Sequence, residues 1–116
     1  MTELDKLEAY LKDRNIPYKR IDEKPPLPKD LVAYLPREER IGFGERHQII
    51  VTDKTGKRLW DVICQWGSYG FEQGLLEGWQ GIFGKHDPVG WLTAEDVIKR
   101  IEENELCKRH TTKAPA

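Results

Sequence analysis

The sequence has no long apolar run, little cysteine and no signal-like start. No apolar stretch approaches the roughly 20 residues that a membrane-spanning helix needs, and the Met-Thr-Glu-Leu-Asp start carries two acidic residues and no basic one, unlike a secretory signal. Its two cysteines, Cys64 and Cys107, form neither a disulfide framework nor a Cys-x-x-Cys zinc pattern. We therefore expect a cytoplasmic protein that has no membrane partner.

An excess of charge of one sign is missing too. The chain has 19 basic and 20 acidic residues, which gives a net charge of −1, whereas nucleic-acid binders usually carry a net or segregated basic surface. Only the tail is biased, through Lys108, Arg109 and Lys113, and three charges at a chain end are typical of a solvated terminus. Nucleic acid is not an expected partner.

What the sequence does contain fits one small domain. Its 116 residues lie within the usual size of a single domain. The hydrophobic fraction is 38% and includes four tryptophans, each of which can bury much area. We expect residues 1–106 to form one domain and residues 107–116 to form a flexible tail.

The two ends of this domain carry helix signals. Thr2 with Asp5 and Thr93 with Asp96 have the spacing of the capping box at a helix start, and Asn15 before Ile16-Pro17 should end the first helix. The residues at helical spacing that would face the core are Leu4, Leu7 and Leu11 in the first helix and Val97, Ile98 and Ile101 in the last.

The middle of the chain predicts a β-hairpin. Residues 47–52 and 58–66 are rich in strand-forming residues, and Asp53–Gly56 suits a type I turn closed by a left-handed glycine. If Asp53 pairs with Lys57, the two residue numbers of every cross-strand pair add up to 110, which defines the predicted register. Residues 18–21 predict a further short strand. We expect an α+β fold in two layers, with a small, mainly antiparallel sheet packed by the N- and C-terminal helices.

Two segments have weaker patterns. Four prolines in residues 24–46 forbid a regular strand and limit any helix to about residues 29–35, so we expect an ordered excursion. Residues 71 to about 77 predict a helix that frays after Gly78. Its glycine stripe should let a neighbouring backbone of the same chain approach closely, and residues 79–91 predict an aromatic-rich loop that could form a contact surface.

The loop at residues 66–70 is the first candidate site. Its backbone N–H groups would face an anion at a helix N-terminus, and its aromatic side chains could stack on a flat ligand. In the alternative interpretation, Ser68 caps the helix while Trp66 and Tyr69 pack in the core. The solvent exposure of Trp66 and Tyr69 distinguishes the two interpretations, because a binding role requires exposed rings. The candidate binding residues are Trp66, Gly67, Ser68, Tyr69, Gly70 and Trp79.

Catalytic and metal chemistry have little support. In the predicted register His47 faces Ile63, so Asp61 would be its diagonal neighbour and the two could form an acid/base pair or a plain surface ion pair. A register slip of one residue would break this pair. Ser68 lacks the Gly-x-Ser-x-Gly spacing of a nucleophile elbow, and the scattered histidines predict no metal site. We expect no cofactor.

The chain resembles small uncharacterised proteins of bacteriophages and prophages. The features that carry this resemblance are the Leu-x-x-Leu-x-x-x-Leu opening helix, the His47–Val51 strand, and residues 64–70 running into Gly74–Glu77. It spans residues 1–105 and is one of style and motif order. It implies that the protein binds a host component, including components of bacterial defence, and it transfers no catalytic residue.

These observations favour a non-catalytic binding module, in the form of a phage-encoded inhibitor that occupies the surface of a host protein. A nucleotide- or anion-binding protein that uses residues 66–70 is the alternative. A small enzyme based on His47 and Asp61 is a further one. A homodimer is left open.

Overall fold

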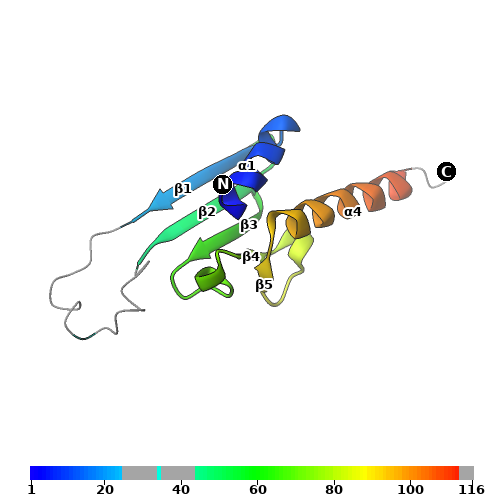
Figure 1. The fold of residues 1–116 in the computed structure, drawn as a ribbon. Coiled ribbons are helices and arrows are strands. Elements are labelled where there is room, and N and C mark those ends of the chain that lie inside the picture. Colours follow the sequence, from blue (N-terminus) through cyan, green and yellow to red (C-terminus); the bar gives the residue numbers. More distant parts are fainter. Residues whose placement is uncertain (25–33, 35–43, 113–116) are drawn as a thin grey trace.

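The computed structural model describes residues 1–24, 34 and 44–112, with side chains described up to residue 106 (Figure 1). The elements in chain order are helix α1 (Glu3–Asp13), strands β1 (Tyr18–Glu23), β2 (Arg46–Thr52) and β3 (Arg58–Gln65), the 3-10 turn η1 (Phe71–Gln73), strand β4 (Leu76–Trp79), the 3-10 turn η2 (Gly81–Phe83), strand β5 (Val89–Leu92) and helix α4 (Ala94–Thr112).

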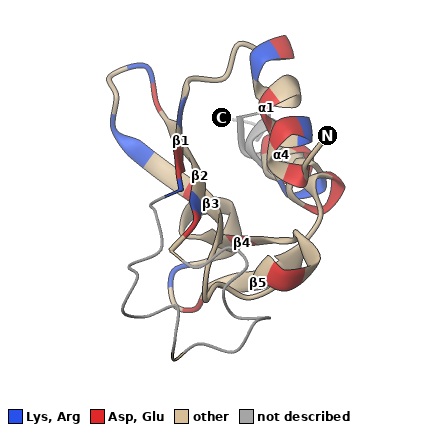
Figure 2. Ribbon diagram, turned by 60° about the vertical axis from the view of Figure 1, so that its left-hand side comes forward, with Lys and Arg blue, Asp and Glu red and all other residues tan. Residues whose placement is uncertain are grey.

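The strands form one antiparallel sheet in the order β1-β2-β3-β4-β5, so each strand pairs with the next along the chain. Helices α1 and α4 lie together on one face of this sheet (Figure 2). The predicted α+β class is therefore confirmed, with one layer of helices and one of strands. Among the described residues, no helix is long and apolar enough to cross a membrane.

The core lies between the sheet and the two helices. Alternate residues of a strand point to the same face, which is why β2 and β3 each send every second side chain inward. α1 and α4 contribute residues from one stripe each, as their helical spacing predicts. The largest fully buried side chains are Leu7, Leu11, Ile49, Val51, Val62, Leu76 and Val97.

Both predicted capping boxes are present. The Asp5 amide donates to the Thr2 hydroxyl and the Thr2 amide donates to the Asp5 carboxylate, and Thr93 and Asp96 exchange the same two bonds. The first helix ends at Asp13, just before Asn15 with its left-handed backbone (φ 56°). Helix α4 runs to Thr112, past the domain end expected at residue 106.

The predicted turn of the β2–β3 hairpin is confirmed, but the predicted register is wrong. The Asp53 amide donates to the Lys57 carbonyl and Gly56 is left-handed (φ 90°). Thr52 pairs with Arg58 as expected, yet Val51 then pairs with Trp60. Leu59 is the extra residue of a β-bulge. From there to the end of the hairpin, every pair is shifted by one residue.

The helix expected at residues 71–77 is wrong. Only η1 is helical. It ends at Gln73 and is followed by Gly74, whose left-handed backbone (φ 71°) turns the chain away. Residues 76–79 instead form β4, which pairs with β3. A Cβ added to Gly78 would lie 2.4 Å from the Phe83 ring. Gly78 thus makes room for a side chain from η2, not for the neighbouring backbone that the glycine stripe was expected to admit.

The segment expected to be a loop at residues 79–91 holds η2 and most of β5, and β5 extends the sheet by pairing with β4. The helix of 29–35 and the ordered excursion at 24–46 fall almost entirely outside the described residues.

Candidate functional site

The aromatic side chains of the 66–70 loop are exposed. Trp66 retains 43% of its accessible surface and Tyr69 retains 54%. The interpretation that places both rings in the core is therefore wrong. The loop connects β3 to η1 and is tied to the start of β2 by the Trp66 amide, which donates to the Glu45 carbonyl (2.9 Å).

Ser68 faces its own backbone. Its hydroxyl donates to the Gln65 carbonyl (2.7 Å) and accepts from the Gln65 amide (3.1 Å). The residue that precedes η1 is Gly70, which provides no side-chain cap. The predicted capping role of Ser68 is thus wrong, and its hydroxyl closes the turn that follows β3.

The geometry of the loop argues against an anion site. A turn of three residues, η1, replaces the helix whose N-terminus would attract an anion. The Tyr69 amide already donates to the Glu77 carboxylate (3.3 Å). The Ser68 and Phe71 amides donate to backbone carbonyls. A carboxylate from β4 thus already occupies part of the space that a phosphate group would need.

Tyr69 stacks on an exposed aromatic ring that the sequence did not mark as a site residue. Its ring centroid lies 5.1 Å from that of Trp91, with the planes at 26°. Trp91 is 60% exposed. Gly90 permits the stack, because a Cβ there would lie 2.4 Å from that of Tyr69. The only signal for Trp91 in the sequence was its place in the aromatic-rich stretch 79–91.

Trp79 lies on the sheet face that turns away from the helices. It pairs with Asp61, and Glu77 pairs with Ile63. These four side chains, together with His86 and Pro88 from the η2–β5 connection, line a pocket of about 310 Å³. The bond from the Tyr69 amide to Glu77 places this pocket next to the Tyr69–Trp91 stack. Trp79, a predicted binding residue, thus borders the same surface.

Asp61 is a structural anchor at the floor of that pocket. It is 5% exposed. One carboxylate oxygen accepts from the Arg58 guanidinium (2.6 Å) and the other from the side-chain amide nitrogen of Gln48 (2.8 Å). The guanidinium of Arg58 also lies 5.8 Å from the centre of the Trp79 ring. Both oxygens of this buried carboxylate are therefore satisfied.

The structure does not bring His47 and Asp61 together. Because of the bulge, His47 pairs with Cys64, and Asp61, three residues before Cys64, points to the opposite face. The His47 ring instead bridges Asp22 (2.6 Å) and Glu45 (2.6 Å). Burial lowers the pKa of His47, but the hydrogen bonds to the two carboxylates outweigh it and raise the pKa above its usual value.

This geometry leaves no acid/base pair at His47 and Asp61. Cys64, opposite His47, is no substitute, because burial raises the pKa of its thiol and disfavours the reactive thiolate. Across the described ranges, no group of three or more His, Cys, Asp and Glu side chains could hold a metal ion.

What stands out is the surface built by Trp66, Tyr69 and Trp91 and bordered by the pocket at Trp79; we call it the aromatic surface. Comparisons of the chain with protein-family models, curated proteins and solved structures give no match. Function must be argued from this surface.

Proposed function

We propose that this protein is a non-catalytic binding module that engages a partner protein through its aromatic surface. Tyrosine and tryptophan are enriched at the energetic centres of protein interfaces, because they bury a large area for little loss of conformational freedom. Three such side chains, Trp66, Tyr69 and Trp91, are exposed within or against one loop. Aromatic side chains that remain exposed to solvent contribute little to the stability of the core, so core packing does not explain these three residues.

The observation that carries the proposal is the backbone of Trp91. Its φ of 54° lies in the left-handed region, which costs an L-residue other than glycine about 1 kcal/mol or more. Strained positions of this kind cluster at functional sites. The Trp91 ring is mostly exposed, and its stack with Tyr69 does no more than offset that strain. A role in binding explains why a bulky residue stands there.

The resemblance to phage proteins supports a more specific form of the proposal. In it, the protein acts in the bacterial cytoplasm and inhibits a host protein, such as a defence component, by covering part of its surface. The near-neutral charge fits such a role, because it favours a protein partner over nucleic acid.

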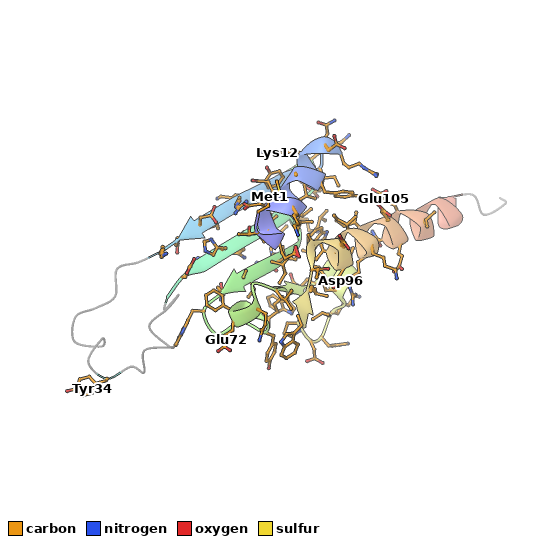
Figure 3. All side chains as sticks on the ribbon, viewed as in Figure 1. Met1, Lys12, Tyr34, Glu72, Asp96 and Glu105 are labelled. Carbon is orange, nitrogen blue, oxygen red and sulfur yellow. The ribbon has the colours of Figure 1, made fainter. Side chains whose placement is uncertain are left out.

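Affinity capture with matched variants tests the proposal. The bait is the full chain, and the prey is bacterial lysate. We compare the unchanged protein with the double variant Tyr69→Ser, Trp91→Asn and with Leu106→Ser. Leu106 is an equally exposed apolar residue next to Glu105, on the part of α4 far from Glu72 and the 66–70 loop (Figure 3).

Proteins that the unchanged chain and Leu106→Ser retain, and that the double variant loses, are the expected result. Binding is then measured with the purified partner. Equal retention by all three baits, with circular dichroism showing all three folded, would contradict the proposal. A thermal shift with a nucleotide panel checks the rival ligand class; we expect no stabilisation.

A further inference from the structure

The pocket beside the aromatic surface has the size and chemistry of a site for one side chain. Its volume of about 310 Å³ lies at the low end of the roughly 300–1,000 Å³ of ligand sites. Trp79 and Pro88 supply flat apolar walls. A pocket this small fits one long side chain better than a cofactor.

The charge of the pocket favours a cation. Asp61 is neutralised by its ion pair with Arg58. Among the residues that the structure describes, Glu77 has only the Tyr69 amide as a hydrogen-bond partner. None of the ion pairs among the described residues includes Glu77. A carboxylate without a counter-ion at the rim of an aromatic-walled pocket attracts a positively charged group, and the Trp79 ring face adds a cation–π contribution.

The ring of Trp79 already accommodates a guanidinium of the same chain. Arg58 lies 5.8 Å from its centre while bonding to Asp61. Arg58 is not among the residues that line the pocket, so its guanidinium does not fill it. A guanidinium is planar, stacks on aromatic rings and can donate two parallel bonds to one carboxylate, which an ammonium group cannot.

We propose that this pocket binds an arginine side chain of the partner protein, stacked on Trp79 and paired with Glu77. This inference rests on the proposed function, because it adds a specificity determinant to the same interface. Apolar residues that flank the arginine would contact Tyr69 and Trp91. The partner segment therefore has one arginine among apolar or aromatic neighbours.

An NMR titration tests the pocket without the partner. N-acetyl-arginine amide should shift the indole N–H signal of Trp79 and the ring signals of His86 in a saturable way. N-acetyl-citrulline amide has nearly the same shape without the charge and should bind about two- to fivefold more weakly, the range expected from losing one accessible ion pair. Equal binding of the two compounds, or shifts outside the pocket, would overturn the proposal.

Two variants with the same charge change sharpen the test. Glu77→Gln keeps an oxygen that can accept the Tyr69 amide bond but removes the pocket charge. Glu72→Gln removes a charge from η1, which lies between the 66–70 loop and β4 (Figure 3), at a residue outside the pocket lining. We expect only Glu77→Gln to weaken arginine binding, by about two- to fivefold. An equal loss in both variants would show a general charge effect and would contradict the assignment.

Affinity capture separates this inference from the function on which it rests. Glu77→Gln should lose the same proteins as the Tyr69/Trp91 double variant. If capture depends on Tyr69 and Trp91 but not on Glu77, the binding function stands and the arginine pocket is wrong. If arginine amide binds as predicted but capture is indifferent to all three residues, the pocket serves a free small cation and both the partner arginine and the aromatic interface are wrong.

Discussion

Trp91 combines two properties that rarely meet in one residue, a left-handed backbone and an exposed indole ring. Asparagine tolerates the left-handed region much better than tryptophan does. Replacement by asparagine should therefore recover part of the strain, of the order of 1 kcal/mol, and lose a stack with Tyr69 of similar size.

We predict that Trp91→Asn leaves the free energy of unfolding within about 1 kcal/mol of that of the unchanged chain while it abolishes partner capture. Urea unfolding followed by circular dichroism measures the first quantity. A much larger loss of stability would show that Trp91 is a packing residue.

His47 gives a pH-dependent prediction. Its pKa in the folded state is raised because Glu45 and Asp22 hold the ring. The protonated ring therefore stabilises the fold fully below its unfolded pKa of about 6.5, and this contribution disappears as the pH rises through the folded pKa. Above that pH, the difference in unfolding free energy between the unchanged chain and His47→Gln should shrink. If the difference in unfolding free energy between the two proteins stays constant between the unfolded and the folded pKa of His47, the prediction is wrong.

For single residues, the sequence predicted local interactions better than contacts between distant parts of the chain. Spacing alone placed Thr2 with Asp5 and Thr93 with Asp96, because a cap is a local interaction over three residues. The contact of His47 with Asp22 could not be predicted, since Asp22 comes from another strand. The contact with Glu45 was missed, although alternation along one extended segment places residues two apart on the same face. Trp91 was missed because nothing in a sequence reports a backbone angle.

At the scale of elements, β4 is the main departure from expectation. Residues 71–77 have helical spacing of apolar residues, but the glycines at 70, 74 and 78 weaken a helix. In the structure, Gly70 and Gly74 flank η1 and turn the chain through their left-handed backbones, and Gly78 in β4 leaves room for the Phe83 ring. The bulge at Leu59 could not be predicted from the sequence either, because an extra residue in one strand leaves the turn sequence unchanged.

Gly78→Ala separates the two structures for this segment. In a helix, alanine would stabilise the chain by about 1 kcal/mol relative to glycine. In the strand, the new methyl group meets the Phe83 ring, and crowding of this kind costs about 1–3 kcal/mol. We predict a loss of unfolding free energy. Gly74→Ala is the control for strain alone, since a Cβ there has open space around it; its cost should be the smaller of the two.

At the scale of the whole molecule, the two-layer arrangement follows from features that the sequence shows plainly. Two capped amphipathic helices and a hairpin with a clear turn define an α+β fold before any coordinate is known. The aromatic surface does not follow in the same way. It forms where the β3–β4 connection reaches β5, and it therefore depends on the two strands that local patterns did not predict.

The charge distribution of the molecule agrees with a protein partner. Figure 2 shows acidic and basic residues interspersed along both helices and across β1, a pattern unlike the basic stripe of a nucleic-acid binder. An interface centred on aromatic rings with one cation-binding pocket is consistent with that surface.

Site-specific photocrosslinking tests whether the aromatic surface contacts a partner protein. A photoreactive phenylalanine derivative replaces Trp91 in one protein and Leu106 in another, and both are irradiated in bacterial lysate. We predict a discrete crosslinked adduct from position 91, competed away by the unchanged chain, and none from position 106. The absence of an adduct at position 91, or the same adducts at both positions, would contradict a binding role for the aromatic surface.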